Sequence, residues 1–298
     1  MKYLLLVNIN SRRYKKILRK SAKIRKIFYA NGHTLEAVYS STIEDSSDAL
    51  KRAVIEKFDV VILGGGDGAV NLGVNLLAGT DVKLALIPTG TVNVFAKEVK
   101  LPLISVSRAV KVILRNHSCR FDLGLINGKK YFLVMAGAGI DGYAVKMKDR
   151  YYKNIIGRFS YLIAAARYFF SHKPSIIVRI PDKNINEKCG SVIIGNMHKY
   201  GGRFSVTSLA NPTDGILDIL LLKGTMPLDF LKYFVGVIFG KHLYFNDVSY
   251  YQAEKFILET EGKYPAYYQT DGDPAGELPI EVTVEPLKIE IVVPRKYM

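Results

Sequence analysis

The stretch DVVILGGGDGAVN, residues 59–71, places four glycines within five positions, directly after a run of apolar residues. Asp59–Leu63 predicts a buried β-strand, and Val70–Ala78 predicts the helix that follows it. Glycines at such a junction let consecutive main-chain N–H groups turn toward one point, where the positive end of the helix also attracts anions. The stretch therefore predicts a phosphate-binding loop, and the alternative is a tight strand-to-helix turn without a ligand.

A second polar loop follows the next predicted strand, Lys83–Ile87. It reads IPTGTVNVFAKE, residues 87–98, and again opens a helix. Gly90 permits close approach of a ligand, while Thr91 and Asn93 offer a hydroxyl and an amide. Ligands of parallel α/β sheets bind at the carboxyl ends of the strands, so two such loops on neighbouring strands indicate a site.

The first 120 residues alternate between short apolar strands and helices. This alternation predicts a parallel sheet with helices on its faces. A helix capped at Ser46 or Ser47 is expected to run to Lys57. The other predicted elements are the strands Lys2–Ile9, Thr34–Tyr39, Asp59–Leu63 and Lys83–Ile87, and the helices Tyr14–Ala30, Val70–Ala78 and Ser105–Arg115.

Candidate strands dominate from about Arg120 onward, and Asn127-Gly128 predicts a hairpin turn between the first two. We therefore predict an α/β protein with an N-terminal three-layer parallel-sheet nucleotide-binding domain, residues 1–120, to which the tail 294–298 can return. A mainly antiparallel β-sandwich domain, residues 121–293, follows. Its predicted elements are the strands Phe121–Ile126, Lys130–Met135, Ser175–Ile180, Ser191–Ile194, Ile216–Leu222, Ala253–Leu258, Ile280–Val284 and Lys288–Val293, and the helices Ile156–Phe170 and Leu228–Gly240.

A literal G-x-G-x-x-G motif occurs at Gly137–Gly142. A dinucleotide-binding fold would place an acidic residue about 20 positions further on, to hold the ribose. That neighbourhood reads GRFSYLIAA and has none, and the motif lies outside the α/β part. We interpret it as a turn rather than a cofactor site.

Composition narrows the class of protein. The chain has 298 residues, 49% of them apolar, and Lys+Arg exceed Asp+Glu by 42 − 27 = 15. Such a basic chain is expected to bind polyanions: nucleic acid, an anionic membrane or phosphorylated substrates.

The apolar part of MKYLLLVNIN is too short for a signal peptide. Two cysteines, 70 positions apart, support neither a zinc site nor a disulfide framework, so we expect a cytoplasmic protein.

The two loops resemble those of a known family. GGDG followed by P-x-GT-x-N-x-FA is similar to the diacylglycerol kinase catalytic family, which includes sphingosine kinases and bacterial lipid kinases. Three further segments agree in order: FDLGLINGKKYFLVMAGAGID (121–141), GNMHKYGGRFSVTSLANPTDGILDILLLK (195–223) and TDGD (270–273). The resemblance covers nearly the whole chain and implies an ATP-dependent lipid kinase that acts on a lipid such as diacylglycerol.

The resemblance also implies roles for individual residues. The family's glycine loop holds ATP, Asp67 helps to place metal and phosphates, and a structural Mg²⁺ lies beside an Asp-Gly pair of the second domain, here Asp214-Gly215. The family's D-G-E motif supplies the general base, and this chain has Asp271-Gly272-Asp273. The nucleotide-binding residues would be Asn8, Asn10, Thr42, Gly65, Gly66, Asp67, Gly68, Ala69, Asn71, Thr91 and Asn93. The metal ligands would be the Asp214 carboxylate and the main-chain oxygens of Asn211 and Ile216, of the oxygen type that Mg²⁺ prefers.

The chain departs from the family pattern at three positions. Ala69 replaces a threonine, Leu72 replaces a glutamate, and Asp273 replaces the glutamate of D-G-E. The shorter acid moves its carboxylate by about 1 Å, which can matter to a general base. The alternative function is therefore a catalytically weak or inactive nucleotide- or lipid-binding protein of the same fold.

Two basic segments are candidates for the surface that binds an anionic partner. Nine Lys/Arg occur between Arg12 and Lys26, and tyrosines alternate with cations between Tyr143 and Arg158. Basic and aromatic residues together favour an anionic membrane surface, and no nucleic-acid-binding motif is present, so no nucleic acid is expected as a partner. We expect a cytoplasmic, peripherally membrane-associated protein, and a homodimer is compatible with the sequence. The apolar segment 228–245 is interpreted as a core helix rather than a shallowly inserting one.

Overall fold

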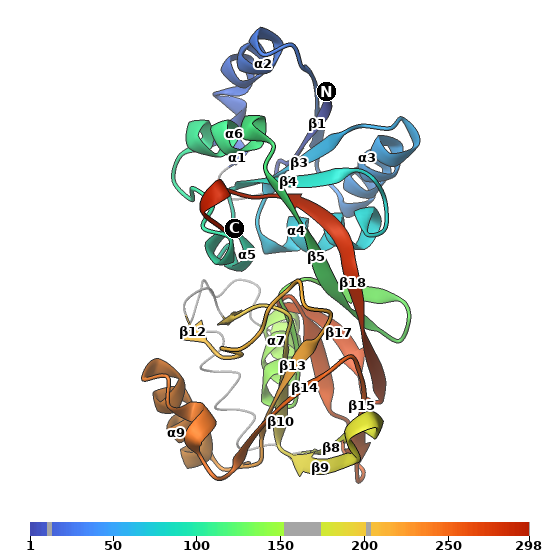
Figure 1. Cartoon of the computed structure of the whole chain (residues 1–298), viewed down its shortest axis with the longest axis vertical. Helices are drawn as coiled ribbons and strands as arrows, with labels where there is room; N and C mark the ends of the chain where they lie inside the picture. Colours follow the sequence, from blue (N-terminus) through green and yellow to red (C-terminus); the bar gives the residue numbers. More distant parts are fainter. Residues whose placement is uncertain (11–13, 152–173, 201–203, 298) are drawn as a thin grey trace. The chain divides into compact units, whose positions relative to one another are not determined.

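The computed structural model describes residues 1–10, 14–151, 174–200 and 204–297, and its chain divides into two compact units (Figure 1). Unit 1 comprises Met1–Leu123 together with Pro286–Met298, and unit 2 comprises Gly124–Glu285. Two strands, β5 (Ser118–Ile126) and β18 (Ile280–Val292), contribute residues to both units.

Unit 1 is built on a parallel sheet with the strand order β2-β1-β3-β4. These strands are almost continuously apolar because helices cover both faces of the sheet. β18 extends the sheet beyond β4, where Ile291 pairs with Leu84. The four strands are β1 (Lys2–Asn8), β2 (Thr34–Ser40), β3 (Val60–Gly65) and β4 (Lys83–Pro88).

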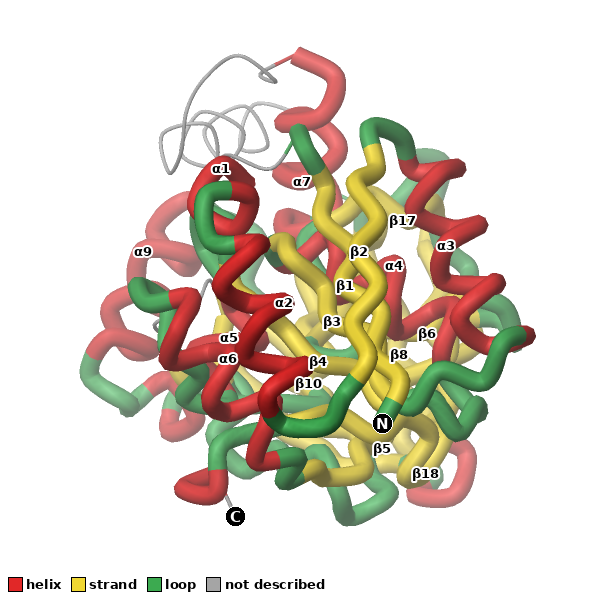
Figure 2. Tube along the Cα trace, turned by 90° about the horizontal axis from the view of Figure 1, so that it is seen from above, coloured by secondary structure: helices red, strands yellow, loops and turns green. Residues whose placement is uncertain are grey.

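Helices α1, α2 and α6 cover one face of this sheet, and α3 and α4 cover the other (Figure 2). On the first face, Ile17 and Phe28 pack against Tyr3 and Ile62 in one continuous apolar cluster. Alternate strand residues point to the opposite face, as the twofold period of a strand requires. The helices are α1 (Tyr14–Leu18), α2 (Ser21–Ala30), α3 (Ile43–Ile55), α4 (Asp67–Leu77), α5 (Val94–Glu98) and α6 (Val106–Arg115).

Unit 2 contains two antiparallel sheets. One has the order β14-β13-β10-β7-β16-β17, and the other joins β18, β15, β8 and β9. Its strands are β6 (Lys130–Phe132), β7 (Met135–Ala138), β8 (Ser175–Ile180), β9 (Ile185–Cys189), β10 (Ser191–Gly195), β11 (Lys199–Tyr200), β12 (Phe204–Ser205), β13 (Leu217–Leu222), β14 (Val248–Ala253), β15 (Lys255–Glu261), β16 (Tyr267–Thr270) and β17 (Asp273–Glu277). Its described helices are α7 (Ile140–Tyr151) and α9 (Pro227–Ile238).

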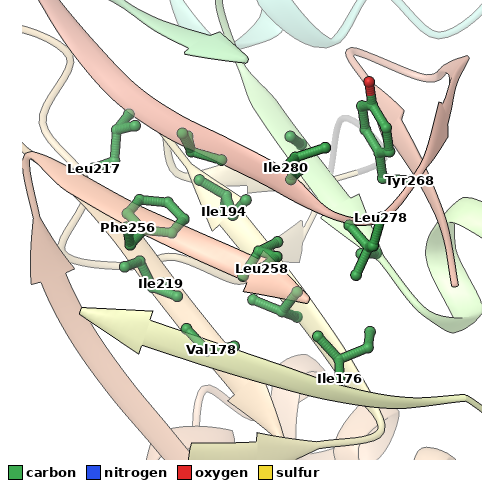
Figure 3. Packing of buried hydrophobic residues seen from close by; sticks show 14 of the residues in the cluster. Ile176, Val178, Ile194, Leu217, Ile219, Phe256, Leu258, Tyr268, Leu278 and Ile280 are labelled. Atoms are coloured by element: carbon green, nitrogen blue, oxygen red, sulfur yellow. The ribbon is translucent and has the colours of Figure 1, made fainter. Parts of the chain in front are cut away.

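The core of unit 2 lies between these two sheets (Figure 3). Ile194 and Ile219 come from the first sheet, and Val178, Phe256 and Ile280 come from the second. All are buried, and together they close one apolar cluster. The predicted fold class, a parallel-sheet α/β part followed by an antiparallel β-sandwich, is therefore confirmed.

Several predicted elements of unit 1 and unit 2 need correction. The single helix expected over Tyr14–Ala30 is two helices, α1 and α2, because the chain turns at Arg19-Lys20. The strand expected over Ala253–Leu258 changes sheets instead. Ala253 pairs with Leu217 in one sheet, whereas Lys255 pairs with Thr283 in the other.

Further differences concern the ends and joins of elements. Helix α4 begins at Asp67, three residues before its predicted start. The two strands expected at 280–284 and 288–293 form one long strand, β18. The segment 130–135 is broken between β6 and β7, and the helix predicted over Ile156–Phe170 lies outside the described residues.

The G-x-G-x-x-G segment is a strand-to-helix junction and not a simple turn. Helix α7 begins at Ile140, directly after β7, and packs against β16. A side chain at Gly142 would come within 1.9 Å of the main-chain oxygen of Tyr267. Packing of the helix against the sheet therefore accounts for this glycine without a cofactor.

Across the described ranges, no helix is both long enough and apolar enough to span a membrane.

Candidate active site

The polar loops of unit 1 lie at one edge of its sheet. Asn8 ends β1, Ser40 ends β2, Gly65 ends β3 and Pro88 ends β4, and all four strands run parallel. The strand order reverses between β1 and β3, since the chain goes outward to β2 on one side and to β4 on the other. This point is where open α/β sheets bind their ligands.

The glycine loop and the second loop touch through their main chains. A side chain at Gly66 would lie 2.9 Å from the Cα of Gly90, and one at Gly90 would lie 2.6 Å from the Cα of Gly66. The amide of Thr89 also donates a hydrogen bond of 2.8 Å to the Gly65 carbonyl oxygen. Gly66 and Gly90 are therefore required for the loops to pack together, which is a structural role.

The Asp67 carboxylate fastens the same two loops. It accepts a hydrogen bond of 2.7 Å from the Val94 amide, at the start of α5. Burial raises the pKa of Asp67, and the neighbouring amides of Val94, Phe95 and Asn93 act against the rise. Asp67 thus holds the second loop in place, a role that its position in a glycine motif does not reveal.

Gly68 differs from its neighbours because the fold does not require a glycine there. It lies in the first turn of α4, is exposed and does not adopt a left-handed conformation, and a Cβ added to it would meet no atom within 4 Å. The first amides of a helix have no partner within the helix and point outward. The space over Gly68 is therefore open to an anion that approaches those amides.

Two polar atoms at this edge are buried without a hydrogen-bond partner among the described residues. They are the hydroxyl oxygen of Thr89 and the side-chain oxygen of Asn93, whose amide group donates to the Gly90 carbonyl oxygen at 2.9 Å. Buried polar atoms are normally paired, so two unpaired ones in the same loop are typical of a ligand site. Sequence reasoning missed Thr89. Thr91, which it selected, is exposed on the same loop.

The loops after β1 and β2 are joined in a similar way. The Asn10 amide nitrogen donates to the Asn8 side chain at 2.8 Å, and the Asn10 side chain donates to the Ser41 carbonyl oxygen at 2.6 Å. The Thr42 hydroxyl accepts from the Asp45 amide and caps α3. These three predicted nucleotide contacts all lie at the strand-end edge, and each also has a local structural role.

Two further predicted residues lie on or beside α4. Asn71 is buried, and its side-chain oxygen accepts a hydrogen bond of 3.0 Å from Asn75. Ala69 packs against the glycine loop, because a side chain at Gly65 would lie 2.4 Å from its Cβ. A small residue at position 69 is therefore compatible with this tight loop.

In unit 2, the Asp-Gly-Asp segment forms a two-residue hairpin turn between β16 and β17. Asp271 (φ 50°) and Gly272 (φ 89°) are left-handed, and Thr270 pairs with Asp273 across the turn. The Asp271 carboxylate accepts three main-chain hydrogen bonds of 2.8–3.0 Å, from Leu133, Val134 and Met135. These bonds interrupt the predicted strand 130–135 and anchor the turn. Asp273 lies exposed at the start of β17.

A buried side-chain network supports this turn from behind. The Gly272 amide donates to the Gln269 side-chain oxygen at 2.7 Å, and the Gln269 side-chain nitrogen donates to Asp141 at 2.7 Å. The Tyr200 hydroxyl donates to the other oxygen of Asp141. Burial raises the pKa of Asp141, and the two hydrogen bonds oppose that rise. None of Gln269, Asp141 and Tyr200 was selected from the sequence.

This network gives a pH dependence of stability. Burial raises the pKa of Asp141 above the usual value of an aspartate, so the folded state holds this proton to a higher pH than the unfolded state does. The stabilising contribution is therefore complete below about pH 4 and is lost as the pH rises through the folded-state pKa. Asparagine has the same shape and does not titrate. Relative to Asp141→Asn, the wild-type free energy of unfolding is expected to fall as the pH rises above about 4.

Urea unfolding at several pH values measures this difference. Asp81→Asn, at an exposed aspartate, is the control. A wild-type-minus-Asp141→Asn difference that does not change with pH would contradict the assignment.

The predicted metal ligands lie in the loop before β13. Asp214 is exposed, and its carboxylate accepts from the Ile216 amide at 3.1 Å, while Thr213 donates to the Asn211 side chain. Asp218, which sequence reasoning missed, is buried close by. Burial, with the Asp214 charge, raises the pKa of Asp218.

A cation would fit at this position. One oxygen of Asp218 accepts from Tyr250 at 2.6 Å and from Gln252 at 3.1 Å, but the other is buried without a partner among the described residues. A buried carboxylate oxygen beside a second carboxylate has the charge and ligand type of a Mg²⁺ site. The residues present therefore fit the ion.

Phosphoryl transfer requires a site for phosphates and a carboxylate that can accept a proton. The strand-end edge of unit 1 has the chemistry of the first, and the exposed Asp273 of unit 2 has the chemistry of the second. Comparison with known proteins identifies the class of protein. Residues 2–126 match the family described as "Diacylglycerol kinase catalytic domain", and residues 134–293 match "YegS C-terminal NAD kinase beta sandwich-like domain".

Individual relatives extend over most of the chain. A diacylglycerol kinase from Mycobacterium tuberculosis is 30% identical over 257 residues, which is 84% of this chain and 82% of that protein. One from Bacillus subtilis is 24% identical over 278 residues, 92% and 91% of the two chains. A solved diacylglycerol kinase structure from Bacillus anthracis has the same fold, with a TM-score of 0.79 at 23% identity over 100% of this chain and 98% of that one.

The chain thus belongs to the diacylglycerol kinase family and is a lipid kinase, as its sequence motifs predict.

Proposed function

We propose that this protein transfers the γ-phosphate of ATP to the hydroxyl group of diacylglycerol. The observation that carries the proposal is the strand-end edge of unit 1, where Gly68 is open and two buried oxygens, of Thr89 and Asn93, have no partner among the described residues. Family membership supports phosphoryl transfer to a lipid, and the names of the relatives support diacylglycerol as the acceptor.

The roles of the residues follow from the chemistry. The amides at the start of α4 bind the phosphates, and the loop of Thr91 and Asn93 forms a second wall of the nucleotide site. Asp273 accepts the proton of the lipid hydroxyl group. At the same time the oxygen of that hydroxyl group attacks the γ-phosphorus of ATP, and the bond between this phosphorus and ADP breaks. The products are ADP and the phosphorylated lipid. Bound Mg²⁺ would offset the phosphate charge during transfer.

We assign different roles to the two aspartates of the hairpin turn. Both oxygens of Asp271 already accept main-chain hydrogen bonds, so Asp271 positions the turn. Asp273 is exposed and follows a turn held at both ends, by Asp271 and by Gln269. A base must be both accessible and fixed, which favours Asp273.

Labelled ATP tests the proposed reaction. Purified protein is incubated with γ-labelled ATP, Mg²⁺ and diacylglycerol in mixed micelles, and the lipids are separated by thin-layer chromatography. Label is expected in phosphatidic acid. A folded protein that binds ATP and labels no lipid, with diacylglycerol or with a total lipid extract, would support the inactive binding protein instead.

We also propose a structural Mg²⁺ at Asp214 and Asp218, with main-chain oxygens of Asn211 and Ile216. Without a cation, the charges of the two carboxylates repel each other. Millimolar Mg²⁺ is therefore expected to raise the Tm of the wild type by a few degrees, on the order of 1 kcal/mol of linkage, and to have little effect on Asp214→Asn.

Differential scanning fluorimetry with and without EDTA measures this shift. Asp182→Asn, at an exposed aspartate of the same unit, is the matched control and should respond like the wild type. An equal Mg²⁺ response of Asp214→Asn would place the stabilising ion elsewhere.

The last part of the proposal is location. A lipid kinase must reach a substrate that is held in a bilayer, and the net charge of +15 favours an anionic membrane surface. We therefore propose a cytoplasmic protein in peripheral contact with the membrane. Of the basic residues between Tyr143 and Arg158, Lys146 is described; it pairs with Glu277 at 3.6 Å and lies over the Tyr267 ring.

A further inference from the structure

Helix α9 of unit 2 carries apolar residues on both its inner and its outer side, and the described residues cover the inner side. Its inner residues Phe230, Tyr233 and Val237 pack with Leu220 and Leu222 of β13. Gly236 lets the helix approach Phe245 and His242. The interpretation of segment 228–245 as an ordinary core helix is therefore wrong for the outer side.

The outer side of α9 presents large apolar residues to solvent. They recur at helical spacing along one stripe and are 43–76% exposed. Phe239 follows directly at the helix end, and Figure 1 shows α9 at the periphery of unit 2. We call this surface the α9 face. Its residues are Leu228, Leu231, Phe234, Val235, Ile238 and Phe239.

Few charged residues border the α9 face, and those that do are of both signs. Asp229 caps the helix through the Met226 amide at 2.9 Å, and Asp247 is held by Lys232 and by the Tyr233 hydroxyl. Lys241, just beyond the helix, is exposed and forms no ion pair among the described residues. The charges of these two aspartates and two lysines sum to zero, so no net negative charge beside the apolar stripe repels an anionic bilayer, and the net charge of +15 of the whole chain attracts one.

The dimensions of α9 fix how it can meet a bilayer. Its 12 residues span about 18 Å, less than the roughly 30 Å of a hydrocarbon core, so at a bilayer it would lie in the interface and would not cross. An exposed apolar helix face with aromatic residues is typical of a segment that inserts to the depth of the lipid headgroups.

We propose that the α9 face is a membrane-docking surface that inserts its apolar side chains among the lipids of an anionic bilayer. The inference rests on the proposed membrane contact and deepens it by naming the surface. The role of α9 is then to bind the protein to the bilayer, which is distinct from the catalytic role proposed for Asp273.

The absence of tryptophan from the sequence makes a direct test simple. Phe234→Trp introduces one fluorophore on the α9 face, and Ile55→Trp places one at an exposed position on α3 of unit 1 as a matched control. With vesicles of phosphatidylglycerol and phosphatidylcholine, the emission of the Phe234→Trp variant is expected to shift to shorter wavelength and to be quenched by brominated acyl chains. The control should show neither effect. Unshifted, unquenched emission from vesicle-bound Phe234→Trp protein would overturn the inference.

A second pair of variants measures binding without a fluorophore. Leu231→Ser with Ile238→Ser is expected to weaken sedimentation with the same vesicles by about tenfold or more, and Ile55→Ser should not. Unchanged sedimentation overturns the inference. So does conversion of a dimer to a monomer with vesicle binding intact, because the face would then be a subunit interface.

Kinase activity on short-chain diacylglycerol in detergent separates the two proposals. If the α9 variant loses vesicle binding and keeps this activity, both proposals stand. If the wild type binds vesicles and has no kinase activity, the proposed function fails and the α9 face is unaffected. If the activity is present and α9 has no part in vesicle binding, the α9 inference alone is wrong.

Discussion

Replacing Asp273 with asparagine is expected to lower kcat for lipid phosphorylation by about 10²–10⁴-fold, the usual contribution of a general base. The KM for ATP should change little, because Asp273 belongs to the acid-bearing turn of unit 2 and not to the glycine loop. Steady-state kinetics with labelled ATP measure both constants. The fold should be preserved, since Asp273 is exposed and asparagine fits the start of β17.

Two further variants make this result specific. Asp273→Glu restores the longer acid of the family's D-G-E motif and is expected to retain activity. Asp271→Asn removes an acceptor that holds three amides, so it should lower the Tm as well as kcat. Full activity of Asp273→Asn would remove Asp273 from the reaction, and activity lost only in Asp271→Asn would move the base to Asp271.

Gly68→Ala is expected to change stability and nucleotide affinity in opposite directions. Alanine is the better helix former, and nothing lies within 4 Å of the added Cβ, so the free energy of unfolding should rise by up to about 1 kcal/mol. The same methyl group would occupy the space where phosphates approach the first amides of α4. The Kd for ATP should therefore increase by about tenfold or more, about 1.4 kcal/mol.

Chemical unfolding and isothermal titration calorimetry measure the two effects. Gly66→Ala is the comparison, because its side chain would meet the Gly90 backbone at 2.9 Å and should weaken both stability and binding. If Gly68→Ala binds ATP as tightly as the wild type, the open space over the glycine loop is not the phosphate site.

The fold could be predicted from the sequence where the pattern is local. Short apolar strands alternating with helices indicated the parallel sheet of unit 1, and the density of strand signals indicated the sandwich of unit 2. Errors arose where distant residues decide the outcome. The strand predicted at 130–135 is broken because its main-chain amides donate hydrogen bonds to Asp271, more than 130 positions later. The strand predicted at 253–258 is divided because its two halves pair with strands of different sheets.

The candidate site shows the same division. The glycine loop and the second loop could be predicted from the sequence because each is a local strand-to-helix junction. Both lie at the carboxyl ends of the parallel strands, as predicted. The capping role of Asp67 on α5 depends on a contact 27 positions away, and the Asp141–Gln269 bond spans 128 positions. Asp271-Gly272 is itself a hairpin signal, so the turn that presents Asp273 could have been found from the sequence.

The most direct measurement of the central claim is a crystal structure with a non-hydrolysable ATP analogue and Mg²⁺. The phosphates are expected to lie against the amides of Gly66–Gly68, at the start of α4, with Thr89 or Asn93 within hydrogen-bond distance of the nucleotide or of its bound water. A nucleotide bound away from the carboxyl ends of β3 and β4 would contradict the claim.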